Sequence, residues 1–180
     1  MEYRKALLTG LLTGLLVIGL LVPVFAEQRT VRATSPWEGD GYAFPIGNDR
    51  VYMVAVFTGT IFIEDGTGAL HTGSIVCPAT VEGDLNTMTK KGQGHCIITN
   101  DDGDRVFADY NCTGDMESCR GPFTLVGGTG KFKGITGEGE MISRIQSRDI
   151  LIVEGFESTH QIGEGIAIWP KLTYSIPDAQ

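Results

Sequence analysis

The stretch that decides the fold is residues 51–63, which read VYMVAVFTGTIFI. This stretch is rich in β-branched and aromatic residues, contains no proline, and runs into the turn-forming residues 64–68, EDGTG. Such a run is typical of a β-strand. Both of its alternating faces are largely apolar, so we expect both faces to be covered, and alternation alone assigns neither face to the interior.

The same pattern of short β-rich runs and Gly/Asp turns recurs along the chain, with no sustained apolar period of 3.6 residues. Antiparallel strands that are joined by short turns lose their exposed edges when they close into a barrel. We therefore predict an all-β fold, an eight-stranded antiparallel β-barrel, with a two-sheet sandwich as the alternative. The predicted strands are residues 51–63, 73–82, 87–99, 104–113, 121–126, 138–145, 150–160 and 165–174.

The N-terminus has the features of a signal peptide. Arg4 and Lys5 precede an uncharged, Leu-rich run over residues 6–22, and Val24-Phe25-Ala26 fits a cleavage site. A retained membrane anchor is the alternative. We predict a secreted or periplasmic protein that has no membrane association after cleavage. Its predicted parts are a signal peptide at 1–26, an irregular N-terminal arm at 27–50 and a β-barrel domain at 51–180.

Four cysteines lie beyond this leader, and an even number in an exported protein predicts disulfides. If the strands that carry Cys77 and Cys96 form one hairpin around residues 86–87, the two cysteines lie directly opposite each other. Cys112 and Cys119 flank a short loop. We therefore predict the disulfides Cys77–Cys96 and Cys112–Cys119.

Several classes of function are disfavoured by the composition and the motifs. The net charge is −8, whereas a nucleic-acid-binding protein needs a basic surface. The chain has neither a Cys-x2-Cys pair nor a His-Glu-x-x-His motif, so we expect no metal site. Residues 127–134, GGTGKFKG, do not have the spacing of a phosphate-binding loop. They predict a tight turn between strands, and we expect no cofactor.

Four ionisable residues lie within the predicted strands and are the candidate catalytic residues: Asp109, Glu138, Glu140 and Arg144. A carboxylate and an arginine that are held in an apolar barrel lumen could polarise or deprotonate a bound ligand. The alternative is that these side chains lie on the solvated outer face of the barrel.

Two segments resemble a known family. Residues 104–112, DRVFADYNC, and residues 119–137, CRGPFTLVGGTGKFKGITG, are similar to exported bacterial proteins of the allene oxide cyclase barrel group, to which plant dirigent proteins also belong. The similarity covers about residues 51–145. It implies an eight-stranded barrel with a central apolar cavity. It also implies that the protein acts on a reactive apolar intermediate without a cofactor and forms a homo-oligomer.

Three functional hypotheses follow, and whether the protein is an enzyme is left open. In the first, the exported barrel binds a small apolar molecule in its lumen. In the second, it is a cofactor-free cyclase or isomerase, or a dirigent-like guide of a reactive apolar intermediate. In the third, it is a structural envelope protein, which an exposed apolar patch around Trp37, Tyr42 and Phe44 would favour.

Overall fold

The computed structural model describes residues 27–146 and 159–177. These residues form eight β-strands and one short 3₁₀-helix, η1. The elements are β1 (Glu27–Pro45), β2 (Arg50–Ile63), β3 (Thr72–Asp84), β4 (Thr89–Thr99), β5 (Arg105–Asp115), β6 (Ser118–Gly128), η1 (Gly130–Phe132), β7 (Thr136–Ile145) and β8 (Thr159–Ile176).

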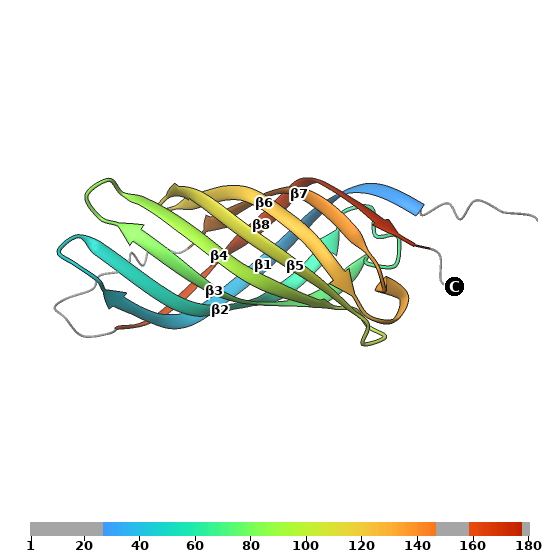
Figure 1. Cartoon of the computed structure of the whole chain (residues 1–180), viewed down its shortest axis with the longest axis horizontal. Helices are drawn as coiled ribbons and strands as arrows, with labels where there is room; N and C mark the ends of the chain where they lie inside the picture. The colour runs from blue at the N-terminus through green and yellow to red at the C-terminus, as the bar shows by residue number, and fades with distance from the viewer. Residues whose placement is uncertain (1–26, 147–158, 178–180) are drawn as a thin grey trace, which may run out of the picture.

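The eight strands form a closed antiparallel barrel in which each strand pairs with its neighbours in sequence (Figure 1). The barrel closes where β1 pairs with β8 as well as with β2. Closure leaves no strand edge unpaired, which is the reason that meandering strands favour this architecture. The predicted eight-stranded barrel is therefore confirmed.

The prediction of an irregular N-terminal arm is wrong for residues 27–45, which form β1. This strand contains two prolines and two glycines, and these residue types disfavour a β-strand locally. Pairing with strands on both sides overrides these local preferences, since Trp37 lies opposite Gly59 of β2 and Gly165 of β8. Part of the predicted strand at 150–160 and all of the predicted signal peptide lie outside the described residues.

The glycine-rich segment 127–134 is a turn between β6 and β7, as predicted. Its residues Gly130 and Gly134 have φ values of 52° and 80°, a region that glycine enters without strain. The ammonium of Lys131 donates to the Asp102 carboxylate at 2.6 Å. This ion pair connects the turn to the neighbouring β4–β5 hairpin.

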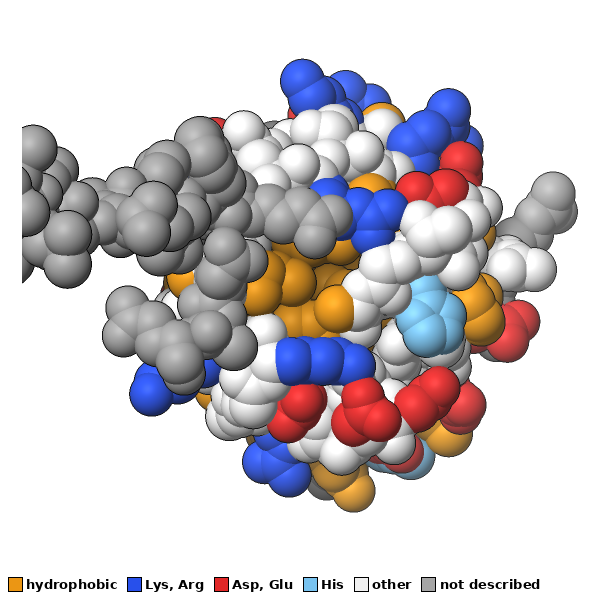
Figure 2. Space-filling view, turned by 90° about the vertical axis from the view of Figure 1, so that its right-hand side faces the viewer, with side chains coloured by type: hydrophobic (Ala, Val, Ile, Leu, Met, Phe, Trp, Pro, Cys, Tyr) orange, Lys and Arg blue, Asp and Glu red, His pale blue; other side chains and the backbone are white. Residues whose placement is uncertain are grey.

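One end of the barrel interior is filled by side chains. Leu70, Phe132, Ile135 and Leu172 are completely buried there, and Tyr174 is almost so. Figure 2 looks onto the end of the barrel that lies at the right of Figure 1, and hydrophobic side chains are visible at its centre inside a rim of charged ones. The packed core therefore occupies this half of the barrel.

Glycines make room for large side chains elsewhere in the lumen. Three aromatic residues each lie directly across from a glycine on the neighbouring strand: Phe57 from Gly39, Trp37 from Gly165, and Tyr110 from Gly94. A Cβ added to Gly94 would lie 2.7 Å from the Tyr110 ring. Alternation of large and small residues fits side chains into a narrow barrel, and it accounts for these three glycines.

In the part of the chain that the structure describes, no helix has the length and apolar character needed to cross a membrane.

Candidate functional site

A cavity of about 800 Å³ occupies the other half of the barrel interior. All eight strands contribute to it. It is lined by Ser35, Trp37, Gly39, Gly41, Val51, Met53, Ala55, Phe57, Thr58, Ile75, Cys77, Val81, Gly83, Leu85, Met88, Lys90, Gly92, Cys96, Tyr110, Cys112, Met116, Glu117, Cys119, Met141, Ser143, Ile145, Gln146, Gln161, Ile162, Gly163, Ala167 and Trp169. Leu85, Met88 and Ile145 are also exposed at the surface, so the cavity reaches solvent at this end.

Sulfur-containing side chains form much of the cavity wall. Both disulfides line it, together with Met53, Met88, Met116 and Met141. Methionine is flexible and polarizable, so such a wall can adjust to apolar molecules of different shapes. Glycines on three strands, at positions 39, 41, 92 and 163, also line the cavity, and Gly163 faces open space.

Aromatic residues form another part of the wall. The Trp37 ring contacts the Phe57 ring edge-on, with their centroids 5.3 Å apart, and Trp169 packs against Phe123 in the same way at 5.0 Å. The indole nitrogens of Trp37 and Trp169 are buried and have no hydrogen-bond partner among the described residues. Burial also raises the pKa of Tyr110 to about 12, so this hydroxyl stays protonated at neutral pH.

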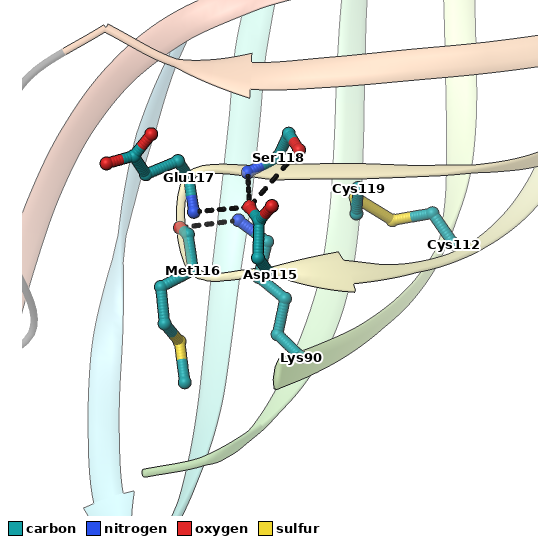
Figure 3. Close-up of a disulfide and its surroundings, with 7 residues drawn as sticks. All are labelled: Lys90, Cys112, Asp115, Met116, Glu117, Ser118 and Cys119. Carbon is teal, nitrogen blue, oxygen red and sulfur yellow. Dashed lines mark hydrogen bonds between the residues drawn. A yellow bond between two sulfur atoms is a disulfide. The ribbon is translucent and has the colours of Figure 1, made fainter. Parts of the chain in front are cut away.

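Among the described residues that line the cavity, Lys90 is the one basic side chain, and it lies near the solvent end. Its ammonium donates a hydrogen bond to the backbone carbonyl of Met116 at 2.9 Å (Figure 3). Burial lowers the pKa of Lys90, and the Asp115 carboxylate opposes that effect. The cavity thus combines an apolar interior with a few polar groups, which is the usual make-up of a small-molecule site.

Both predicted disulfides are confirmed. Cys77 and Cys96 are joined across the β3–β4 hairpin, with their Cα atoms 4.1 Å apart, and Cys112 and Cys119 are joined across the β5–β6 hairpin, with theirs 5.5 Å apart. In the β3–β4 pair, Ile75 lies opposite Ile98, and the same register places Cys77 opposite Cys96. All four cysteines are buried, so both disulfides lie on the inside of the barrel.

None of the four candidate catalytic residues faces the lumen. Asp109, Glu138, Glu140 and Arg144 are all exposed on the outer face, at positions that alternate with inward-facing residues such as Ala108 and Met141. An ionised side chain keeps its hydration on the outer face, whereas in the lumen it would need a buried partner. These four side chains therefore do not supply acid–base groups inside the lumen.

Asp109 has a structural contact instead. It lies directly across from His95 of β4, and its carboxylate is 2.6 Å from Nδ1 of that imidazole. His160 makes a similar contact to Asp40 at 2.8 Å, also on the outer face. Within the described residues, no group of three or more His, Cys, Asp or Glu side chains could hold a metal ion.

The apolar patch that the structural hypothesis requires is divided between two faces. Tyr42 and Phe44 are exposed on the outer face of β1, next to the exposed Val54 of β2. Trp37, by contrast, lines the cavity. The three residues therefore do not form one surface.

Sequence reasoning missed the lumen residues Lys90 and Tyr110. A signal for both was present, because the buried Cys96 lies on the same strand face as Gly94, Gly92 and Lys90. Tyr110 likewise shares a strand face with Cys112. Alternation counted from the disulfides would have placed both side chains inside.

Comparisons with known proteins find no matching family model and no matching curated protein. A search of solved structures finds, among others, the structure of a pterocarpan synthase dirigent protein. This likeness has a TM-score of 0.45 and 11% sequence identity, and it covers 86% of this chain and 89% of that chain. Membership of the family that the sequence resembles remains a prediction, as does a homo-oligomeric state.

Proposed function

We propose that this protein is an exported barrel that binds a small apolar molecule in its lumen. The observation that carries the proposal is the cavity of about 800 Å³, which is lined mainly by apolar side chains and reaches solvent at one end. The opposite half of the same barrel is filled, so an open lumen is not simply a consequence of this fold. Burial of apolar ligand surface against such a wall is favourable.

The two disulfides agree with export, because such bonds persist in oxidising compartments. They also stiffen the cavity wall from which their sulfur atoms project. A binding site that is formed before the ligand arrives loses less conformational entropy when the ligand binds.

The cyclase and dirigent-like alternatives lose the residues on which they were based. The ionisable side chains that line the lumen are Lys90, Tyr110 and Glu117 rather than the four predicted ones. The structural alternative loses Trp37 from its patch, whereas Tyr42 and Phe44 remain exposed on the outer face. Binding is therefore the function that the site supports best.

A larger side chain inside the lumen should weaken binding without unfolding the barrel. At Gly163, a Cβ would have no heavy atom of the described residues within 4 Å, and the backbone there is extended. We expect Gly163→Leu to weaken the binding of Nile red, an apolar fluorescent probe, by at least about tenfold, because the new side chain occupies the site. Fluorescence titration measures this affinity, and thermal melting checks that the variant is folded.

Two variants serve as matched controls. Gly163→Ala adds only a methyl group to the cavity, and Gln93→Leu adds a leucine at an exposed position on the outside of β4. Both should bind Nile red within about twofold of the wild type. Equal affinity in Gly163→Leu and the wild type would mean that the probe binds elsewhere, and the proposal would fail.

A further inference from the structure

The residues opposite Lys90 on its two neighbouring strands carry no side chains. Lys90 occupies an inward position of β4, and the residues opposite it on the two neighbouring strands are both glycines, Gly83 of β3 and Gly114 of β5. Neither glycine places a side chain next to Lys90, and the Met116 methyl lies near Gly83, 3.5 Å from where a Cβ would stand. Lys91, the next residue, is exposed on the outer face and is a natural control for the same chemical group in water.

The Lys90 amine has one polar contact, and that contact is neutral. Nζ donates to the Met116 carbonyl, and no carboxylate of the described residues lies within ion-pair distance of it. The nearby Asp115 is occupied by its own turn, since one of its oxygens accepts from Glu117 N at 2.9 Å, Ser118 N at 2.7 Å and Ser118 Oγ at 3.1 Å.

Figure 3 shows how these groups are arranged around the β5–β6 turn. The Lys90 side chain extends to the carbonyl of Met116, while the Glu117 carboxylate extends away from the ammonium on the far side of the turn. The Met116 side chain extends in a different direction from that of Glu117. An amine in this position is partly buried and forms no salt bridge with the described residues.

We propose that Lys90 captures an apolar aldehyde in the lumen as a reversible Schiff base. This inference rests on the proposed function, because the apolar part of the aldehyde must first occupy the cavity. The lumen has the two features that such a lysine needs. It offers apolar surroundings in which an amine is less readily protonated, and it offers space beside the amine for the carbonyl group.

The reaction needs no oxidant, reductant or cofactor. The neutral Nζ attacks the carbonyl carbon and forms a C–N bond, and one N–H proton is transferred, directly or through water, to the carbonyl oxygen to give a carbinolamine. The C–O bond then breaks as the nitrogen lone pair forms the C=N bond, and the second N–H proton is transferred to the departing oxygen, which leaves as water. The products are an imine at Lys90 and one molecule of water, and hydrolysis reverses both steps.

Burial and one nearby carboxylate determine how much of the Lys90 amine is neutral at a given pH. Burial in the lumen lowers the pKa of Lys90, whereas the Asp115 carboxylate raises it, and the net shift is downward. Glu117, the other charged group of this turn, is exposed and directed away from the amine. A lowered pKa increases the fraction of neutral, nucleophilic amine at neutral pH relative to an exposed lysine.

Reductive trapping with decanal tests the inference. Sodium cyanoborohydride, added as the reductant, transfers hydride to the imine carbon and fixes the alkyl group on the lysine. We expect peptide mass spectrometry to show labelling of Lys90 at least about tenfold faster than labelling of Lys91. Lys90→Met should remove the fast phase, and Lys91→Met should keep it.

If Lys90→Met does not fold, competition by decanol in the wild type provides a second test. This alcohol fills the lumen but has no carbonyl, so in the wild type it should slow labelling of Lys90 and leave Lys91 unchanged. Labelling of Lys90 that is no faster than that of Lys91 would overturn the inference. If Nile red still binds in that case, the proposed function stands, whereas absence of Nile red binding would mean that the proposed function has failed as well.

Discussion

Replacing Gly94 by valine is expected to lower the free energy of unfolding by about 2–3 kcal/mol. A Cβ at this position would lie 2.7 Å from the Tyr110 ring, 2.8 Å from the Pro78 carbonyl oxygen and 2.9 Å from the Ala79 Cβ. Two of these atoms belong to β3, so a rotation of Tyr110 alone cannot relieve the overlap. Urea denaturation, followed by far-UV circular dichroism, measures the change.

Gly163→Val is the matched control for this variant. Both glycines face the lumen, but Gly163 looks into open space whereas Gly94 is covered by an aromatic ring. We expect Gly163→Val to change the free energy of unfolding by less than about 1 kcal/mol. Equal destabilisation by the two valines would contradict the division of the lumen glycines into covered and open positions.

Removal of the Cys77–Cys96 disulfide is expected to cost about 3 kcal/mol of stability. The bond closes a chain segment with a sequence separation of 19, and without it the unfolded chain gains conformational entropy. The double variant Cys77→Ala/Cys96→Ala tests this cost and avoids a free thiol. The same denaturation experiment supplies the free energy.

The second disulfide provides the comparison. Cys112–Cys119 has a sequence separation of only 7, so loop-closure entropy predicts a smaller cost, about 2.5 kcal/mol, for Cys112→Ala/Cys119→Ala. A larger loss in this variant than in the first would show that contacts of the sulfur atoms with the lumen, rather than chain entropy, determine the contribution of each bond.

The fold could be predicted from the sequence where local signals are strong. Turn residues bracket the strands from β2 onward, and the positions of Cys77 and Cys96 specify the register of the β3–β4 hairpin. β1 could not be predicted, because its prolines and glycines disfavour a strand locally. Its stability comes from pairing with β8, more than a hundred residues further along the chain.

The site was harder to predict than the fold, because the outer face of this barrel is partly apolar. In β2, the outward Val54 and Val56 are as hydrophobic as the inward Val51 and Ala55, so alternation did not reveal which face is the interior. The same ambiguity placed Glu140 among the candidate lumen residues, although the neighbouring position 141 is the one that faces inward. Glycines that alternate with polar residues mark the inner face here, because the lumen needs small residues opposite its aromatic ones.

Native mass spectrometry of the protein purified from its natural source detects directly whether the lumen holds a ligand. We expect the wild-type protein to carry a small apolar molecule, which is released on denaturation. We expect Gly163→Leu, produced in the same source, to be folded and to carry much less of it. A folded wild-type protein that never retains such a molecule, or a Gly163→Leu variant that retains as much of it as the wild type, would contradict a binding site in the lumen.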